Sequence, residues 1–323
     1  MRRILSIFLV VIPLLSVAQF APPAGQEGST AIDADSPVFV NWATGCTVER
    51  GLRRIDKPSM GYASYGMEAD ALGKADDTLL VSLGDGGRAV VTFDSPICDG
   101  PGPDFAVFEN PLKWDGDTTL YFLELAFVEV SSDGERYVRF PAISLIPTET
   151  QVGTFTCTDP RLVHNFAGKY APHYGTPFDL AELVDSIGLD ISHITHVRLV
   201  DVVGCIKPQY ATYDSQGHIV NDPWPTPFES CGFDLDAVGV IHDVAHSGVE
   251  DNESSMALIY PNPVQGILTV QGSFETVSIF SMTGQLLMES REHTIDVSSL
   301  APGLYLARIL TDGKTLVHKV IVY

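Results

Sequence analysis

The stretch "GFDLDAVGVIH" (residues 232–242) has the composition of a buried β-strand, yet two aspartates lie among its apolar residues. Side chains alternate along a strand, so positions two apart share a face. We therefore expect Asp234 and Asp236 to point the same way, beside a hydrophobic core. An unpaired carboxylate is expensive to bury, so both side chains need partners.

Three kinds of partner are open for these carboxylates: an arginine such as Arg198, the N–H groups of loops, or a bound Ca²⁺ ion. Calcium binds clusters of carboxylate and carbonyl oxygens. The stretch "GPDFAVFEN" (102–110) has the same pattern, with acidic and amide residues at both ends of an apolar strand. The sequence thus predicts a structural calcium site that uses some of Asp104, Glu109, Asn110, Asp234 and Asp236, and loop capping by the same residues is the alternative.

The rest of the chain before residue 243 is also rich in short apolar runs bounded by Gly, Pro, Asp and Ser. This pattern predicts an all-β fold, a jelly-roll-like β-sandwich over residues 19–242. The run "LVSLGDGGRAVVTF" (80–93) indicates a hairpin with a glycine-rich turn. Only 178–188 has helical spacing.

Five segments in this order resemble a galactose-binding-like, discoidin-type jelly roll of bacterial cell-surface proteins. They are "GDGGRAVVTF" (84–93), "GPDFAVFEN" (102–110), "FVEVSSDGERYVRFP" (127–141), "ITHVRLVDV" (194–202) and "GFDLDAVGV" (232–240). The resemblance covers roughly residues 79–242. It implies that loops at one end of the sandwich bind a sugar or another ligand, and that a structural calcium ion is present.

Aromatic residues in polar loops are the best candidates for ligand contact. Trp224 stands between two prolines, in a loop that cannot join a strand ladder, and Trp114 has a similar setting. Tyr170 and His173 belong to a long polar loop. We predict Trp114, Trp224, Tyr170 and His173 as ligand-binding residues, and the alternative for each tryptophan is to plug the end of the sandwich.

The sequence contains no G-x-S-x-G and no H-E-x-x-H motif. Acidic residues are so numerous that pairs of carboxylates are uninformative, although a glycosidase needs such a pair. No catalytic residue is assigned. There are five cysteines, an odd number, and Cys205 with Cys231 is the first guess for a disulfide.

The start of the chain has the features of a secretory signal peptide over residues 1–18. A basic start is followed by an apolar run that is too short to span a membrane. The net charge of −22 argues against nucleic acid as a partner. We expect an exported protein with no membrane span.

Residues 243–257 are polar and acidic and predict a linker. Beyond it, short alternating runs separated by turn residues indicate a small β-sandwich over 258–323. The segments "YPNP" (260–263), "TGQLL" (283–287), "IDVSSLAPGLYLARI" (295–309) and "KVIVY" (319–323) resemble the C-terminal sorting domain of type IX secretion cargo. The resemblance implies an Ig-like sandwich, a type IX translocon and a sortase as partners, and release or attachment to lipopolysaccharide at the cell surface.

Together these features predict a secreted or cell-surface, non-catalytic binding protein for a glycan or another small ligand. The alternatives are an exported hydrolase similar to glycoside hydrolases, and a structural or adhesion protein.

Overall fold

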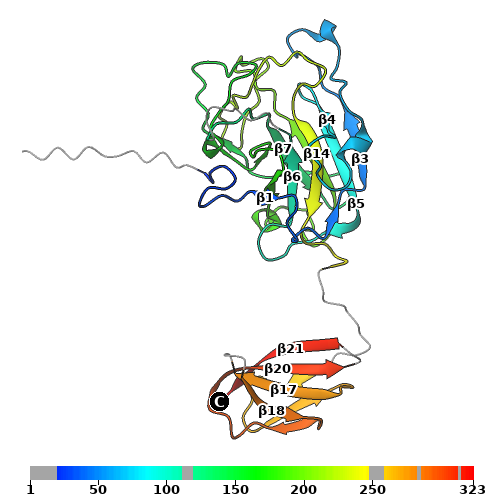
Figure 1. Cartoon of the computed structure of the whole chain (residues 1–323), viewed down its shortest axis with the longest axis vertical. Helices are drawn as coiled ribbons and strands as arrows, with labels where there is room; N and C mark the ends of the chain where they lie inside the picture. Colours follow the sequence, from blue (N-terminus) through cyan, green and yellow to red (C-terminus); the bar gives the residue numbers. More distant parts are fainter. Residues whose placement is uncertain (1–19, 111–118, 247–257, 282–284, 312–313) are drawn as a thin grey trace, which may run out of the picture. The chain divides into compact units, whose positions relative to one another are not determined.

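The computed structural model describes residues 20–110, 119–246, 258–281, 285–311 and 314–323. The chain divides into two compact units between Gly248 and Val249, and both are built from β-sheets (Figure 1). In the described residues no helix reaches seven residues, which confirms the predicted all-β class. The predicted signal peptide and Trp114 lie outside the described residues.

The first sheet of the N-terminal unit has the strand order β1-β12-β6-β14-β2, and β4 also pairs with β14. All its pairings are antiparallel. The strands are β1 (Ile32–Asp33), β2 (Asn41–Trp42), β4 (Val81–Ser82), β6 (Phe105–Glu109), β12 (Tyr174–Phe178) and β14 (Asp234–Val240).

The second sheet has the order β11-β7-β13-β5-β3, with β8 beside β7, and is antiparallel as well. Its strands are β3 (Gly45–Glu49), β5 (Arg88–Ile97), β7 (Ala126–Ser131), β8 (Val138–Arg139), β11 (Phe166–Ala167) and β13 (Ile194–Asp201). A separate pair is formed by β9 (Ile143–Ser144) and β10 (Val163–His164). The short helices are η1 (Pro58–Met60), η2 (Glu68–Ala71), η3 (Pro160–Leu162) and η4 (Leu180–Leu183).

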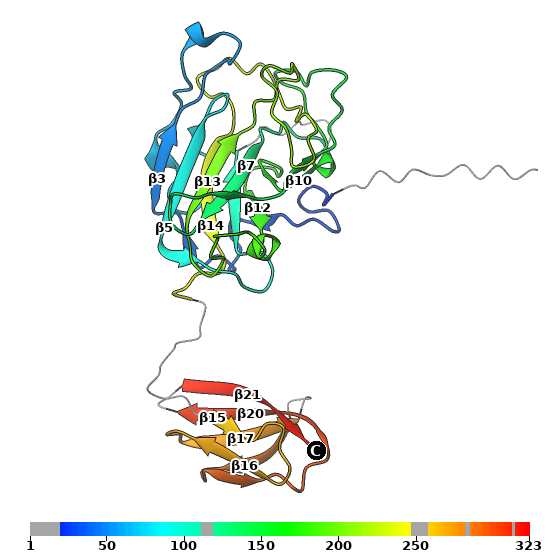
Figure 2. The same ribbon diagram turned by 180° about the vertical axis from the view of Figure 1, so that it is seen from behind.

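The two sheets enclose the main core of the unit. Apolar side chains of β6 and β14 from one sheet, such as Val107 and Val238, join those of β5, β7 and β13 from the other, such as Val91, Val128 and Leu199. Figure 1 shows β14 and β6 side by side, and Figure 2 shows β5, β13 and β7 from behind. The N-terminal unit is therefore a β-sandwich, as the alternating pattern predicts.

Two local predictions are wrong. Residues 80–93 do not form a hairpin, because β4 pairs with β14 in one sheet while β5 belongs to the other. The Gly-Asp-Gly-Gly turn thus carries the chain between the sheets. The helix expected over 178–188 is only the single turn η4, which Asp179 caps by accepting a hydrogen bond from the Ala181 N–H.

Strand β14 contains a bulge that alternation could not reveal. Its register against β6 shifts between Leu235, opposite Glu109, and Ala237, opposite Phe108. A bulge inserts one unpaired residue and re-aims the side chains around it. As a result Asp234 and Asp236, expected to act together, have separate partners.

Cys205 and Cys231 are free thiols in the structure, so the disulfide guessed from sequence is not formed. Cys205 packs against Val203 and Trp224, and the Cys231 Sγ lies 3.9 Å from the Leu52 carbonyl. Burial raises the pKa of Cys231 to about 12.

The N-terminal unit continues past residue 242, into the predicted linker. The Val244 N–H donates to Pro96 O at 2.9 Å, and the Ala245 N–H donates to Ser95 Oγ at 3.0 Å. Asp243 is fully buried and accepts from the Asn41 amide. Residues 243–246 therefore belong to the sandwich, and 247–257 lie outside the described residues.

The C-terminal unit consists of a three-stranded sheet, β15-β16-β19, and a four-stranded sheet, β18-β17-β20-β21. Its strands are β15 (Leu258–Tyr260), β16 (Ile267–Gln271), β17 (Thr276–Ser281), β18 (Leu286–Ser290), β19 (Thr294–Asp296), β20 (Gly303–Thr311) and β21 (Lys314–Val322). Leu268 and Ile295 of one sheet share a core with Ile279, Ile309 and Val320 of the other. This unit is a small sandwich, as predicted, with β15 and β18 as strands that the sequence pattern did not indicate.

Candidate functional site

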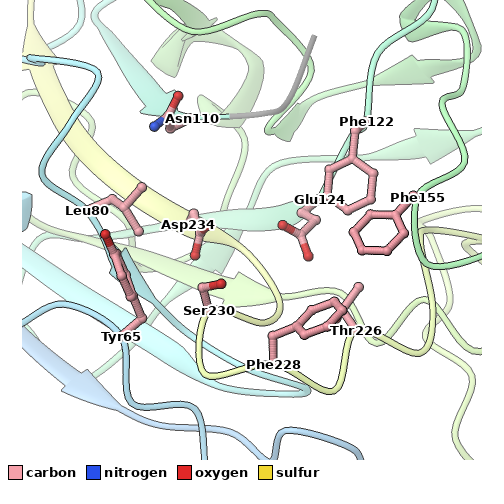
Figure 3. A pocket seen from close by; sticks show the side chains of 10 residues that line it. All are labelled: Tyr65, Leu80, Asn110, Phe122, Glu124, Phe155, Thr226, Phe228, Ser230 and Asp234. Carbon is pink, nitrogen blue, oxygen red and sulfur yellow. The ribbon is translucent and has the colours of Figure 1, made fainter. Parts of the chain in front are cut away.

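A pocket of about 320 Å³ opens at the end of the N-terminal sandwich where β6 ends and β14 begins. Figure 3 shows the carboxyl groups of Glu124 and Asp234 pointing into the space between aromatic side chains. The lining residues are Tyr65, Leu80, Asn110, Phe122, Glu124, Phe155, Thr226, Phe228, Ser230 and Asp234.

One wall of the pocket is a row of phenylalanines. The rings of Phe155 and Phe228 stack with centroids 5.7 Å apart, and Phe122 lies 6.5 Å from Phe155. Phe155 is 65% exposed and Phe228 42%, whereas Phe122 is buried. Apolar rings left open to solvent beside a pocket are typical of surfaces that contact a ligand.

The two carboxyl groups of the pocket differ in their partners. Asp234 begins β14 and accepts a hydrogen bond from Ser82 Oγ. Burial raises the pKa of Asp234 to about 6, although the Ser82 hydroxyl and the charge of Arg50 act in the opposite direction. Glu124 is only 7% exposed, and no described residue donates a hydrogen bond to its carboxyl group. Burial, together with the nearby charges of Asp234 and Glu109, raises the pKa of Glu124 well above its usual value.

Glu109 is the last residue of β6 and pairs with Leu235 of β14. Its side chain is 3% exposed, and neither carboxyl oxygen has a hydrogen-bond partner among the described residues. Burial first, and then repulsion by Asp234, raises the pKa of Glu109 well above its usual value. Glu109 therefore adds an unsatisfied acid to the same end of the sandwich.

Three neighbouring acids each accept at least one hydrogen bond from an N–H group. Asp201 accepts from the Gly86 and Phe233 amides at 2.9 and 2.7 Å. Asp222 accepts from the Leu125 amide at 2.7 Å. Asp85 accepts from the Ile55 amide and from Trp224 Nε1. These three aspartates fix neighbouring backbone segments through hydrogen bonds. Glu109 and Glu124 make no such side-chain hydrogen bonds with the described residues.

The five residues predicted to bind calcium do not converge on one point. Glu109, Asn110 and Asp234 lie around the pocket. Asp104 precedes β6, at the opposite end of the strand from Glu109, and accepts hydrogen bonds from His242 Nδ1 and from two backbone amides. Asp236 accepts from the amides of Asp76 and Asp77 at 3.4 and 3.3 Å.

Loop capping, the alternative for these residues, therefore describes Asp104 and Asp236. Burial raises the pKa of Asp236 to about 7, against the hydrogen bonds that favour its charge. Arg198, which the sequence suggested as a partner for Asp234 and Asp236, instead forms an ion pair with Glu129. Calcium binding stays a prediction.

Two of the predicted ligand-binding aromatics are buried. Trp224 is 5% exposed, donates from Nε1 to Asp85 Oδ2 at 3.1 Å and packs with Cys205, so it plugs the structure as in the alternative. Tyr170 is 1% exposed and its hydroxyl bonds Thr30 Oγ1 at 2.7 Å. Neither side chain lines the pocket.

His173 lies among three aspartates. Its Nδ1 is 3.1 Å from Asp77 Oδ2, and its Nε2 is 3.4 Å from Asp33 Oδ1 and 3.5 Å from Asp35 Oδ2. Asp35 also pairs with Lys74. This arrangement ties the loop before β12 to the N-terminal segment and is away from the pocket.

A second cavity of about 510 Å³ lies beside β12 and is lined in part by His164, Lys169 and Glu182. Lys169 is buried and donates from Nζ to Val163 O at 2.9 Å, and burial lowers its pKa to about 8. The Asn165 amide donates to Glu182 Oε2 at 2.6 Å. Lys169, Asn165 and Glu182 of this cavity thus each have a hydrogen-bond partner within the fold.

Sequence analysis missed Glu124, Tyr65, Phe122, Phe155 and Phe228. Glu124 alone carried a local signal, as one acid in the apolar run "LYFLELAFV" (120–128), of the same kind that singled out Asp234. The aromatic residues come from segments far apart in the chain, and only the folded structure brings them together, although Phe228 is close in sequence to Trp224 and Phe122 to Glu124.

Comparison with curated proteins finds no match. Among solved structures, the chain has a likeness to a beta-1,2-glucanase from Parabacteroides distasonis, with 9% identity and a TM-score of 0.26. The aligned region covers 88% of this chain and 38% of the glucanase, so the chain spans well under half of that protein. A likeness this low carries no argument on fold or activity.

The C-terminal unit is the part with a clear relative. Asn262 of the Pro-Asn-Pro segment donates to Lys319 O at 2.7 Å and accepts from the Ile321 N–H at 2.9 Å, which joins this motif to the last strand. Among the described residues, no helix has the length and apolar character needed to cross a bilayer. Residues 258–323 match the family model of the secretion system C-terminal sorting domain. Residues 258–323 are thus a sorting domain of this family, which supports export as type IX secretion cargo, and the protein is secreted or located at the cell surface.

Proposed function

We propose that the N-terminal unit is a non-catalytic binding module that captures a glycan or another small ligand in the pocket between Glu124 and Asp234. The observation that carries this proposal is the open row of phenylalanines beside two inward-pointing carboxyl groups. Aromatic faces and acidic groups in a concave site on loops are typical of small-ligand binding. The export of the protein places such a pocket outside the cell.

The test is a glycan array and a thermal-shift screen with the full chain, run beside an assay for polysaccharide hydrolysis. Binding without turnover is expected. Phe228→Ala should weaken binding because it removes an exposed ring from the pocket wall. Exposed Tyr213, which does not line the pocket, gives the matched control Tyr213→Ala. Turnover of a polysaccharide would contradict the proposal.

A hydrolase is the second candidate, favoured by one observation. Glu124 and Asp234 share a pocket, and both have raised pKa values, as a general acid requires. This candidate expects hydrolysis that is lost by a factor of at least about 100 in Glu124→Gln. Glu182→Gln, in the second cavity, is the control and should keep full activity.

We further propose that a sortase removes the sorting domain and either frees the N-terminal unit or attaches it to lipopolysaccharide. The sorting-domain match supports this step. Mass spectrometry of the protein recovered from the cell exterior should find residues 20–246 without residues 258–323. An intact chain at the surface would contradict it.

The structural calcium ion also remains a proposal. A tightly bound ion stabilises the folded state by mass action, so EDTA should lower the melting temperature and added Ca²⁺ should restore it. An unchanged melting temperature would show that no calcium ion stabilises the fold.

A further inference from the structure

We propose that the pocket binds a ligand through an organic ammonium group, which sits against the Glu124 and Asp234 carboxylates and the phenylalanine row. This inference rests on the proposed function and names the chemical class of the ligand. The first observation is Glu124. It is more than nine-tenths buried, points into the pocket and has no hydrogen-bond partner among the described residues.

The second observation is the surplus of negative charge. The charge of Asp234 raises the pKa of both Glu109 and Glu124, and the charge of Glu109 raises that of Glu124 further. Arg50, whose charge acts on Asp234, donates its guanidinium to the backbone carbonyls of Tyr65, Gly66 and Ser82 instead of to a carboxylate. Asp234 has the Ser82 hydroxyl as a partner, but no described side chain donates a hydrogen bond to Glu109 or Glu124, and like charges in one site repel. A positively charged ligand removes that repulsion, whereas an anionic ligand adds to it.

The third observation is the aromatic wall. Phe155 and Phe228 present stacked rings next to the acidic groups, with Phe122 beside them. The face of an aromatic ring attracts a cation, and this interaction strengthens where water is excluded. Rings combined with carboxylates therefore favour a cation that has both charge and apolar surface.

A small metal ion fits this site less well than an organic cation. A metal draws several oxygens to within a few ångströms of one another. Among the described residues, three acidic or histidine side chains come that close only in two groups, Asp33–Asp35–His173 and Asp99–Asp104–Asp179. The pocket acids are not among them. With about 320 Å³ of space, the pocket has room for an ammonium group and the body of a small molecule.

The experiment is isothermal titration calorimetry of the full chain with glucosamine, choline and putrescine. Matched neutral and acidic probes are N-acetylglucosamine and glucuronic acid. At least one amine should bind about tenfold more tightly than both matched probes, since that ratio corresponds to one modest charge interaction. Equal or stronger binding of the neutral or acidic sugar would overturn the ammonium inference but leave the proposed function in place.

Glu124→Gln should reduce amine affinity by at least about tenfold. Glu182→Gln removes an acid from the other cavity and should leave affinity unchanged. Amine binding should also release protons at about pH 6, because the cation favours the ionised carboxyl groups. The dependence of the binding heat on buffer ionisation measures this release.

Lys113 needs its own variant, because it is the basic residue nearest to Asn110 in the sequence and lies outside the described residues. Lys113→Gln should bind the amines as the unaltered chain does. If only Lys113→Gln binds them, the lysine itself serves as the cation and the inference fails. If the amines do not bind while another class of ligand does, the ammonium inference is wrong but the proposed function stands. If no ligand binds in this titration or in the array, the proposed function falls as well.

Discussion

The two ends of strand β6 carry buried acids that the protein treats in opposite ways. Asp104, before the strand, accepts hydrogen bonds from the Gly100 and Leu180 amides and from His242. Glu109, at the other end, has no hydrogen-bond partner among the described residues. Both side chains are almost completely removed from solvent.

Asp104 stabilises the fold through its hydrogen bonds, whereas the Glu109 carboxyl group makes no comparable contribution to folding. Asp104 satisfies donors of two loops and so contributes to stability through its bonds. Glu109 loses hydration and receives no hydrogen bond from a described side chain, although the Asn110 backbone favours its charge. Such an acid is destabilising in the fold, and a cation bound in the neighbouring pocket would offset part of its charge.

The largest expected effect is at the satisfied end. Asp104→Ala leaves two buried amides and one histidine nitrogen without their acceptor, and we expect a loss of about 3–5 kcal/mol in the free energy of unfolding. Thermal denaturation should record a fall of roughly 10 °C for the N-terminal unit. The exposed Asp185, as Asp185→Ala, is the control and should change little. If Asp104→Ala lowers the free energy of unfolding no more than Asp185→Ala does, the hydrogen bonds of Asp104 do not stabilise the fold, and the contrast with Glu109 is wrong.

The second prediction concerns Asp236, which the bulge in β14 places near the Glu109 end. Its pKa is raised to about 7 in the folded protein, above the unfolded value of about 4. The folded state therefore holds the proton more tightly, and stability falls as pH rises from about 4 to about 7. We expect this residue to remove about 2 kcal/mol of stability between about pH 5 and pH 7.

Asp236→Asn keeps an oxygen for one of the two amides, places its NH2 group opposite the other, and cannot ionise. Urea denaturation across this pH range should therefore give a flatter profile for the variant than for the unaltered chain. His164, whose burial lowers its pKa, titrates in the opposite sense but is present in both proteins and cancels in the difference. Parallel profiles would show that Asp236 is not protonated in the fold.

The third prediction is a gain of stability at the unsatisfied end. Glu109→Gln has nearly the same shape but no charge, so it removes the repulsion with Asp234 and Asp236. At about pH 8 we expect the free energy of unfolding to rise by about 1–2 kcal/mol. Exposed Glu135, as Glu135→Gln, should show no such gain. A destabilised Glu109→Gln would indicate that the carboxylate has a partner in the fold after all.

Much of this contrast could be read from the sequence, because alternation is a local property. The pattern around 232–242 identified a central strand with two acids in it, and "FAVF" (105–108) identified the strand that pairs with it. Antiparallel pairing then brings Glu109 beside Leu235. Glu109 and Asp234 therefore come together at one end of the sandwich, whereas Asp104 lies at the opposite end of β6.

The bulge, the partners and the pocket could not be predicted in this way. A one-residue bulge shifts which face a side chain occupies without changing the composition of the strand, so Asp234 and Asp236 looked equivalent. The amides that satisfy Asp104 and Asp236 belong to loops whose positions depend on the whole fold. Trp224 lies in a loop of the kind that often forms binding sites, but its indole N–H donates a hydrogen bond to Asp85 and its side chain is buried.

The smallest effect is expected at Ser82, whose hydroxyl is the one hydrogen-bond donor to the Asp234 carboxyl group among the described residues. Ser82→Ala removes a hydrogen bond that favours the ionised form, so the pKa of Asp234 should rise above its present value of about 6. Stability should fall by about 1 kcal/mol above that pKa and remain unchanged below it. Carbon-13 NMR of the carboxyl groups measures the pKa directly.

Ser230→Ala is the matched control for this titration, because Ser230 lines the same pocket but makes no described hydrogen bond to Asp234. Amine binding gives the complementary measurement. If an ammonium ligand neutralises the pocket acids, its addition should lower the pKa of Asp234 in both serine variants. If the pKa of Asp234 does not change when the amine is added, the ligand binds elsewhere. Neutralisation by a cationic ligand would then not explain why the buried Glu109 lies at this end of β6.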